Sequence, residues 1–337
     1  MSFLGRAAAL AATLFLLATP SALGATNGVS SHGQSGSTGV AREKTLSHFW
    51  SAVPSKQIKP VSPPYTLRTP FLVPHQFKSP GPPIEKQGVA GSIAGTHAAV
   101  APLLGSVGTP WSGSQNLLPA TTTGKVFFTD HAGGQWVCSG SLVNSAGKDL
   151  VITAGHCVFG TAGGELPAGE TWHSNWVFAP DYNNGVAPYG YWSARQLWTM
   201  TNYMNSGDEQ DDMGAAILNT VNGQHAVDLL GGQGIAWNQS PLQSIWDFGY
   251  PAAAPFNGQI DEVCNGNDAY DIFIEMEVLP CNFTGGSSGG PWLMQFGGEF
   301  GYVNGVNDAR YSGLPADITS MYFGNNAGAL YNATNNL

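Results

Sequence analysis

Three short motifs contain the three side chains that serine-based hydrolysis requires. His156 lies in the run Thr-Ala-Gly-His-Cys, Asp212 opens the run Asp-Met-Gly-Ala, and Ser288 lies in the glycine-rich run Gly-Ser-Ser-Gly-Gly-Pro. A serine hydroxyl is a poor nucleophile until an imidazole takes its proton, and the imidazole needs a carboxylate to fix its tautomer and stabilise its cation. Because all three groups are present, the sequence predicts a hydrolase that acts through a covalent acyl-enzyme.

The order of the motifs excludes other serine hydrolases. The serine motif also matches Gly-x-Ser-x-Gly, the nucleophile turn of lipases and esterases, in which the histidine follows the serine. The last of the eight histidines is His225, so none follows Ser288. A subtilisin-type order needs an aspartate before the histidine, and neither Asp130 nor Asp149 lies in a matching context.

The four cysteines are expected to form two disulfides. Cys138, Cys157, Cys264 and Cys281 all lie after residue 121. An even number of cysteines in a secreted chain is typical of disulfides, and of the three pairings the sequential one closes the shortest loops. Zinc binding is the alternative, but the chain has no Cys-x-x-Cys and no pair of closely spaced histidines. We therefore expect no metal and no other cofactor.

Short segments of alternating polarity dominate the chain after residue 121. The clearest expected strand spans residues 271–279, with Ile272, Ile274, Met276 and Val278 on one face. Further strands are expected at 125–129, 136–143, 150–153, 215–218 and 301–306, and one helix at 326–331. About 217 residues of such short strands indicate an all-β barrel or sandwich.

Three further stretches accompany the histidine, aspartate and serine motifs in a specific order. They are Cys-Ser-Gly-Ser-Leu-Val at 138–143, Phe-Gly-Tyr-Pro at 248–251 and Gly-Tyr-Val-Asn-Gly-Val at 301–306. With these stretches, the chain from about residue 124 to 337 resembles a chymotrypsin-fold (trypsin-like) serine endopeptidase, closest to the bacterial glutamyl-endopeptidase-like branch. The resemblance implies two packed antiparallel six-stranded β-barrels with the catalytic cleft between them, and a disulfide from Cys138 to Cys157 that braces the loop of His156.

The resemblance also implies a role for each motif. His156 would be the general base and then the general acid, Asp212 the carboxylate that orients it, and Ser288 the nucleophile. The backbone N–H groups of Gly286 and Ser288 would form the oxyanion hole, where a side chain at 286 could obstruct the approaching carbonyl.

Three acidic neighbours make the aspartate the least secure of these assignments. Asp208, Glu209 and Asp211 precede Asp212, and the cluster could simply be a solvated loop. We prefer Asp212 because the Met-Gly-Ala-Ala-Ile-Leu that follows it matches the apolar strand expected after the family's carboxylate.

Substrate specificity and activation depart from the known branches. Six residues before the nucleophile, where trypsin-like enzymes have an aspartate, this chain has Asn282, and where glutamyl endopeptidases have a histidine it has Asn307 and then Asp308. These three residues are the candidate specificity pocket, although Asp308 is more simply explained as a solvated turn residue. Ser287 replaces the aspartate that pairs with a new N-terminus in trypsin, so we expect activation by removal of a covering segment.

Composition and charge divide the chain into three parts. Residues 1–24 contain Arg6, a 12-residue apolar run and small residues before the expected cleavage point, which is typical of a signal peptide and too short to span a membrane. Residues 25–120 hold 12 of the 22 prolines, with 7 basic and 2 acidic groups, and are expected to be a largely irregular, extended or mobile pro-segment or linker. Residues 121–337, with 4 basic and 20 acidic groups, form the expected protease domain.

This charge distribution limits the partners of the protein. A domain with a net charge of −16 cannot hold nucleic acid by neutralising phosphates. The basic stretch could dock on the acidic domain as an intramolecular inhibitor. We therefore expect a secreted monomer with polypeptide substrates and no nucleic-acid or membrane partner. The alternative is a catalytically silent, protease-like secreted binding protein.

Overall fold

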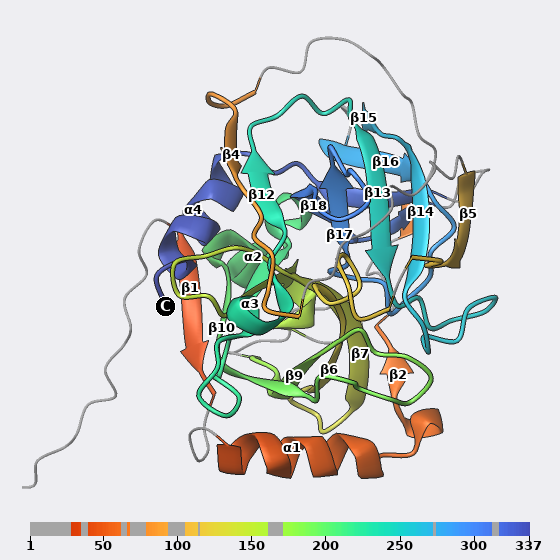
Figure 1. Ribbon diagram of the computed structural model, residues 1–337. Coiled ribbons are helices and arrows are strands. Elements are labelled where there is room, and N and C mark those ends of the chain that lie inside the picture. Colours follow the sequence, from red (N-terminus) through yellow and green to blue (C-terminus); the bar gives the residue numbers. More distant parts are fainter. Residues whose placement is uncertain are drawn as a thin grey trace, which may run out of the picture.

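Strands make up most of the regular structure of this protein (Figure 1). The computed structural model describes residues 28–34, 40–61, 66–67, 79–93, 105–113, 115–160, 171–271, 274–311 and 317–337. The expected signal peptide lies outside the described residues. No helix in the described part of the chain is both long enough and apolar enough to cross a membrane.

The first half of the expected protease domain is a closed six-stranded antiparallel barrel. Its strands are β6 (Thr123–Thr129), β7 (Gln135–Leu142), β8 (Leu150–Ala154), β9 (Ser174–Pro180), β10 (Trp192–Met200) and β11 (Met213–Leu218). Hydrogen-bonded ladders run from β6 through β7, β8, β11, β10 and β9 and back to β6. Val126, Ile152 and Trp176 are among the fully buried side chains of its core. Every strand of this barrel is therefore held on both sides.

The second half consists of two sheets instead of the expected second closed barrel. One contains β12 (Gly234–Trp237), β13 (Ser244–Gly249), β14 (Glu262–Asn267), β17 (Pro291–Met294) and β18 (Tyr302–Val306). The other contains β15 (Ala269–Asp271), β16 (Met276–Pro280), β19 (Arg310–Tyr311) and β20 (Asp317–Met321).

Contacts other than ladders join these two sheets. Strand β14 contacts β16, and β18 contacts β20, without forming ladders. At the first seam Cys264 of β14 is bonded to Cys281, directly after β16. At the second seam the hydroxyl of Ser320 accepts a hydrogen bond from the backbone N–H of Val306 at 2.9 Å. The expected all-β fold is confirmed, and in its second half a disulfide and a side-chain hydrogen bond lie at the seams where ladders were expected.

Most of the expected elements are present. The five shorter expected strands are confirmed within β6, β7, β8, β11 and β18. The expected helix at 326–331 is confirmed and extends over α4 (Asn325–Thr334), whose Tyr331 ring packs on Trp237. The remaining short helices in this part are α2 (Thr201–Ser206), α3 (Ala226–Leu230) and the 3-10 turns η2 (Gly155–Cys157) and η3 (Glu209–Asp211).

The strand predicted at 271–279 is wrong as a single element. The segment turns between β15 and β16, which pair with each other, and Glu275 in the turn has a positive φ of 56°. Residues 272 and 273 lie outside the described residues. Glu277, which alternates with Met276 and Val278 along β16, is 1% exposed in the structure, where β16 also pairs with β20.

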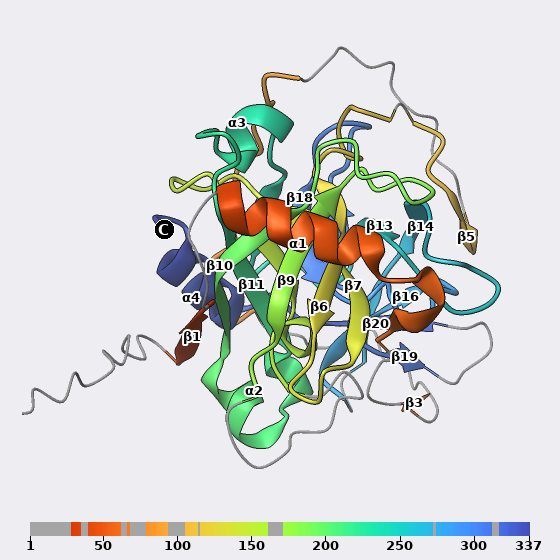
Figure 2. The same ribbon diagram turned by 90° about the horizontal axis from the view of Figure 1, so that it is seen from below.

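The described parts of residues 25–120 are paired along both halves of the protease part. β1 (Val29–Gly33) pairs with β10, β2 (Lys59–Pro60) with β7, β3 (Thr66–Leu67) with β19, β4 (Ile84–Lys86) with β12, and β5 (Gly105–Pro110) with β14. Helix α1 (Val40–Ala52) lies across the outside of the barrel (Figure 2), and the 3-10 turn η1 (Ser55–Gln57) follows it. Regular elements thus recur through a stretch that was expected to be extended or mobile.

Apolar packing and hydrogen bonds hold this stretch in place. Leu46 and Trp50 of α1 are buried against Phe127 and Val177, and the Trp50 indole N–H donates to the carbonyl of Asn175 at 2.9 Å. The ion pairs formed between described residues all lie within residues 121–337. The contacts described for this stretch are thus ladders, apolar surfaces and hydrogen bonds.

Candidate active site

His156 is held at the end of a strand in the closed barrel. Strand β8 leads directly into η2, which contains His156 and Cys157. The preceding Gly155 donates its N–H to the carbonyl of Asp212 at 3.0 Å, and a Cβ at position 155 would lie 2.7 Å from the Asp212 carboxylate. Cys157 is bonded to Cys138, and the second disulfide joins Cys264 and Cys281, so the sequential pairing is confirmed.

Asp212 binds both the ring and the backbone of His156. Its Oδ2 lies 2.7 Å from the ring Nδ1, and its Oδ1 accepts the backbone N–H of His156 at 2.7 Å. Both side chains are fully buried. Burial by itself would raise the pKa of Asp212, but the charge and hydrogen bonds of His156 lower this pKa below its ordinary value. The structure thus brings Asp212 to the imidazole.

The neighbouring acidic residues lie elsewhere. Asp211 accepts a hydrogen bond from Asn326 at 2.6 Å, and Asp208 caps the turn η3 through Gln210. Burial raises the pKa of Glu209 to about 7, with smaller contributions from the charges of Asp212 and Asp208. The acidic cluster is therefore not one solvated loop, because Asp211 and Asp212 are 3% and 0% exposed.

A second histidine supports the position of His156. His173 is buried, stacks on Phe128, and places its Nε2 3.0 Å from the carbonyl oxygen of His156. Burial lowers the pKa of His173 to about 4, so the ring is neutral at neutral pH and its N–H donates to this carbonyl. The sequence offered no motif around His173, which is 17 residues from His156.

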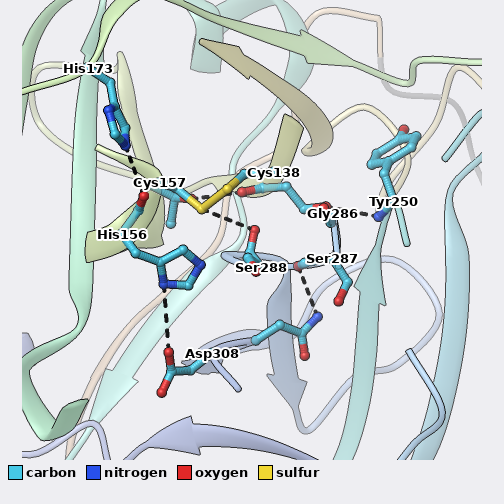
Figure 3. Close-up of a disulfide and its surroundings, with 12 residues drawn as sticks. Cys138, His156, Cys157, His173, Tyr250, Gly286, Ser287, Ser288 and Asp308 are labelled. Carbon is cyan, nitrogen blue, oxygen red and sulfur yellow. Dashed lines mark hydrogen bonds and ion pairs between the residues drawn. A yellow bond between two sulfur atoms is a disulfide. The ribbon is translucent and has the colours of Figure 1, made fainter. Parts of the chain in front are cut away.

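Ser288 lies in the turn that leads into β17, in the second half of the protease part. Its carbonyl accepts the N–H of Ser139 at 2.7 Å, directly beside the Cys138–Cys157 disulfide. Figure 3 shows the His156 ring pointing toward Ser288 next to this disulfide. The Nε2 of His156 is buried and has no hydrogen-bond partner within the described part of the chain. The side of the ring that faces away from Asp212 is thus available to a hydroxyl.

Asn307 fixes the turn that holds Ser288. Its amide nitrogen donates to the carbonyl of Ser287 and to Asp247, at 3.2 and 2.8 Å, and its amide oxygen accepts from the Trp292 indole at 2.8 Å. Its carbonyl accepts the N–H of Gly289, where a Cβ would lie 2.0 Å from the hydroxyl oxygen of Thr153. Because both ends of the Asn307 amide are engaged within the protein, this side chain supports the turn.

The backbone around Gly286 has a defined orientation. Gly286 has a positive φ of 98°, and a Cβ there would lie 2.8 Å from the carbonyl oxygen of Tyr250. The Ser139 hydroxyl donates to the carbonyl of Gly286 and accepts the N–H of Tyr250, each at 2.9 Å. These bonds fix the peptide between Gly286 and Ser287, and the N–H of Ala252 donates to the carbonyl of Gly285 at 2.7 Å, which fixes the peptide that presents the expected oxyanion-hole donor.

A carbonyl from the N-terminal stretch accepts the hydrogen bond of this Gly286 N–H. The N–H of Gly286 donates to the carbonyl of Val61 at 3.0 Å, and the N–H of Val61 donates to the carbonyl of Val137 at 3.1 Å. Val61 is fully buried and directly follows β2. In the full chain, Ser288 and His156 are only 2% and 0% exposed.

The three candidate specificity residues have separate partners. The amide oxygen of Asn282 accepts the backbone N–H of Gly108 in β5 at 2.7 Å, whereas Asn307 holds the serine turn. Asp308 is 1% exposed, so its interpretation as a solvated turn residue is wrong. Its N–H donates to the carbonyl of Thr319 at 2.9 Å, and its Oδ1 lies 3.7 Å from the Nδ1 of His156 (Figure 3).

Comparisons with known proteins identify relatives of this fold and site. The protease Anisep from Arthrobacter nicotinovorans is 39% identical, with a TM-score of 0.59 over 64% of this chain and 96% of that chain. The thermostable serine protease AL20 from an extremophilic microorganism is 38% identical, with a TM-score of 0.59 over 64% and 97%. A Glu endopeptidase, 18% identical with a TM-score of 0.53 over 67% and 95%, shares the fold.

Sequence comparisons alone are less extensive. No family model matches the chain. The "Extracellular metalloprotease" of Bacillus subtilis (strain 168) is 35% identical over 82 residues, which is 24% of this chain and 23% of that protein. The chain thus matches about a quarter of the length of this relative.

The fold and these relatives define a protease. The chain belongs to the family of serine proteases that includes Anisep and AL20, which have the chymotrypsin fold.

Proposed function

We propose that the protein is a secreted serine endopeptidase that acts through His156, Asp212 and Ser288 and is made as a proenzyme. The main support is the fully buried His156–Asp212 pair, with Nδ1 and Oδ2 2.7 Å apart and the opposite ring nitrogen unengaged beside Ser288. A carboxylate on Nδ1 keeps a proton on that nitrogen and leaves Nε2 able to accept one. This is the arrangement that a serine nucleophile needs.

Each step of the proposed reaction has a group in place. His156 Nε2 takes the Ser288 hydroxyl proton as the oxygen attacks the substrate carbonyl, and Asp212 stabilises the resulting imidazolium. The N–H groups of Gly286 and Ser288 bind the oxyanion, and His156 returns the proton to the leaving amine. Water then attacks the acyl-enzyme by the same route. Removing one oxyanion-hole donor typically lowers kcat about 10²- to 10³-fold, so the Gly286 N–H is expected to contribute strongly to the rate.

The Val61 contact supports synthesis as a proenzyme. Its carbonyl fills the Gly286 N–H that the substrate oxyanion would use, and Ser288 is only 2% exposed in the full chain. On the two sides of Val61, β2 pairs with β7 in one half and β3 with β19 in the other, both in parallel. The solved serine proteases match 64% of this chain, which equals the share of residues 121–337. Removal of residues 25–120 would therefore expose the site.

Secretion is supported by independent features. Two disulfides persist best in oxidising compartments, and the Bacillus subtilis relative is described as extracellular. The leader at residues 1–24 has the apolar run of a signal peptide.

The name of that relative raises metal-dependent hydrolysis as a second function, and the donor set here does not fit it. Cys138 and Cys157 are joined to each other, so their sulfurs are not thiolate ligands. His156, Asp212 and Asp308 lie within metal-binding reach of one another, but Nδ1 and Oδ2 are in direct hydrogen-bond contact.

A fluorophosphonate probe, which labels an activated serine, tests the catalytic assignment. We expect processed protein to label and Ser288→Ala to remain unlabelled. Ser287→Ala is the matched control, because its hydroxyl is bonded to the carbonyl of Thr284 and is assigned no chemical step. Wild-type protein that never labels after processing would favour the catalytically silent binding protein.

The same probe tests the proenzyme. Val61→Pro removes the N–H that binds Val137, so labelling of the uncut full-length chain should rise at least tenfold. Lys56→Ala, on the exposed turn η1 nearby, should leave the labelling rate unchanged. An uncut chain that labels as fast as the processed protein would contradict the proenzyme.

A further inference from the structure

Asp308 is a buried carboxyl group at the centre of the site that the proposed reaction does not use. It lies between β18 and β19, and its backbone is fixed by the N–H bond to Thr319 of β20. Its side chain is fully buried beside His156 and Asp212, and the ligand atoms of the three groups lie within 4.8 Å of one another. Any charge on this carboxyl would act directly on the catalytic pair.

Among the described residues, none donates a hydrogen bond that would stabilise an ionised Asp308. Neither of its oxygens has a hydrogen-bond donor among the described residues when both acidic groups are taken as ionised. The charges of Asp212 and Glu209 both disfavour its ionised form, and His156 approaches it only at 3.7 Å. Two adjacent buried carboxyl groups cannot both remain ionised, so one of them holds a proton.

The hydrogen bonds of the site identify which carboxyl holds the proton. Asp212 accepts the backbone N–H of His156 at 2.7 Å and lies 2.7 Å from its ring nitrogen, and both contacts favour its ionised form. Asp308 makes only the longer approach of 3.7 Å to the same nitrogen. The proton therefore belongs on Asp308, which can then donate to Asp212.

We infer that Asp308 is a positioning residue, a protonated carboxylic acid whose O–H donates to Asp212 and holds that carboxylate in line with His156. This role rests on the proposed function of Asp212. Burial raises the pKa of Asp308 well above its ordinary value, and the charge of Asp212 and the hydrogen bond to it act in the same direction. The same hydrogen bond lowers the pKa of Asp212.

A stability measurement, which does not depend on activity, tests whether the Asp308 carboxyl group is protonated. Full-length Ser288→Ala protein, which cannot digest itself in the proposed mechanism, is compared with Ser288→Ala/Asp308→Asn in thermal melts from pH 4 to 7. Both proteins also contain Glu209→Gln, because the pKa of Glu209, about 7, lies in this range.

The direction of the expected change follows from proton linkage. A folded-state pKa above the unfolded value gives stability that is present at low pH and is lost as the pH rises toward the folded pKa. The melting temperature of the protein with Asp308 should therefore fall relative to that of the Asn variant as the pH rises from 4 to 7. If the difference in melting temperature between the two proteins did not change with pH, or if the protein with Asp308 became relatively more stable as the pH rose, the inference of a protonated carboxyl group would be wrong.

Kinetics test the positioning role. Asp308→Asn keeps a neutral donor toward Asp212 and should retain kcat within about threefold, whereas Asp308→Leu removes the donor and should lower kcat at least tenfold with little change in KM. Equal losses in both variants would overturn the inference, as would wild-type kcat in Asp308→Leu. If the Leu variant does not fold, a large loss of kcat in Asp308→Asn still contradicts it.

The outcomes for Asp308 and for the proposed function can be told apart. If wild-type protein does not label at Ser288, the endopeptidase proposal fails, while the melts still decide whether the pair of buried carboxyl groups holds a proton. If wild-type protein labels but the melts show no relative change with pH, only the inference about Asp308 fails.

Discussion

The two halves of the protease part hold their strands together in different ways. In the first half, ladders join each of six strands to both neighbours and close the barrel. In the second half, the seams between its two sheets contain the Cys264–Cys281 disulfide and the Ser320–Val306 bond. The first half positions His156 and Asp212, and the second presents Ser288. A regular backbone thus orients the base, whereas side chains and a covalent link organise the half that supplies the nucleophile.

The largest expected effect concerns the pair in the closed half. In Asp212→Asn, an amide oxygen that keeps the backbone N–H bond of His156 turns the NH2 group toward Nδ1. This favours the wrong tautomer of the imidazole, and the neutral amide does not stabilise the imidazolium, so kcat of the processed enzyme should fall about 10⁴-fold. Asp211→Asn, one residue away and bonded to Asn326, should change kcat less than threefold. Both rates are measured with a peptide ester. A loss of less than tenfold in Asp212→Asn would contradict the catalytic role assigned to Asp212.

The two disulfides allow a direct comparison of the halves. Their loops span 19 and 17 residues, so the chain-entropy contribution is nearly the same, about 3 kcal/mol each. Strand β7 also pairs with β8 beside the Cys138–Cys157 bond, whereas β14 and β16 share no ladder. Replacing Cys264 and Cys281 by Ala should therefore lower the free energy of unfolding more than replacing the other pair. Equal losses in urea denaturation would contradict this difference between the halves.

A smaller effect is expected at the other seam. Ser320→Ala leaves the buried N–H of Val306 without its acceptor, which should cost about 1–3 kcal/mol of stability. Ser141→Ala is the matched change in the closed barrel, where the buried hydroxyl has no partner within the described residues. We expect it to cost less than about 0.5 kcal/mol in the same assay. A neutral Ser320→Ala would mean that the sheets are held by other contacts.

A contrast in the response to pH is expected between two buried groups, one in each half. Burial lowers the pKa of Lys125 in β6 to about 7 and raises that of Glu262 in β14 to about 7. The unfolded chain binds more protons than folded Lys125 above pH 7, so stability rises from pH 7 to 10. It binds fewer than folded Glu262 below pH 7, so stability falls from pH 4.5 to 7.

Two substitutions measure these responses separately. The advantage of Lys125→Met over wild type in melting temperature should shrink as the pH rises from 7 to 10. The advantage of Glu262→Gln should grow as the pH rises from 4.5 to 7. If both differences changed in the same direction with pH, the contrast between the two groups would be lost.

The sequence predicted the strands of the closed barrel better than those of the second half. The strands β6, β7, β8 and β11 follow from short apolar or alternating segments bounded by turn residues, and β8 and β11 are buried along their whole length. The segment at 271–279 has the same alternation, yet it turns at Glu275, since the positive φ of that residue leaves no trace in the apolar pattern. Local periodicity could predict strands but not this reversal.

The N-terminal stretch shows a second limit. Its prolines indicated extended or mobile chain, and the described part contains α1 and five short strands. Their pairing partners lie in both halves of the protease part, far away in sequence. Such partners are set by complementary edges and apolar surfaces, which a local window cannot reveal.

By itself, the sequence determined the chemistry that the chain could perform. The types and order of His156, Asp212 and Ser288 excluded the lipase and subtilisin arrangements, and the cysteines predicted two disulfides. Only the tertiary structure decided that Asp212 contacts the imidazole, that Asp308 is buried against this pair, and that Val61 occupies the Gly286 N–H. The physical reason is that residue types define possible reactions, whereas burial and hydrogen-bond distance arise from packing between segments far apart along the chain.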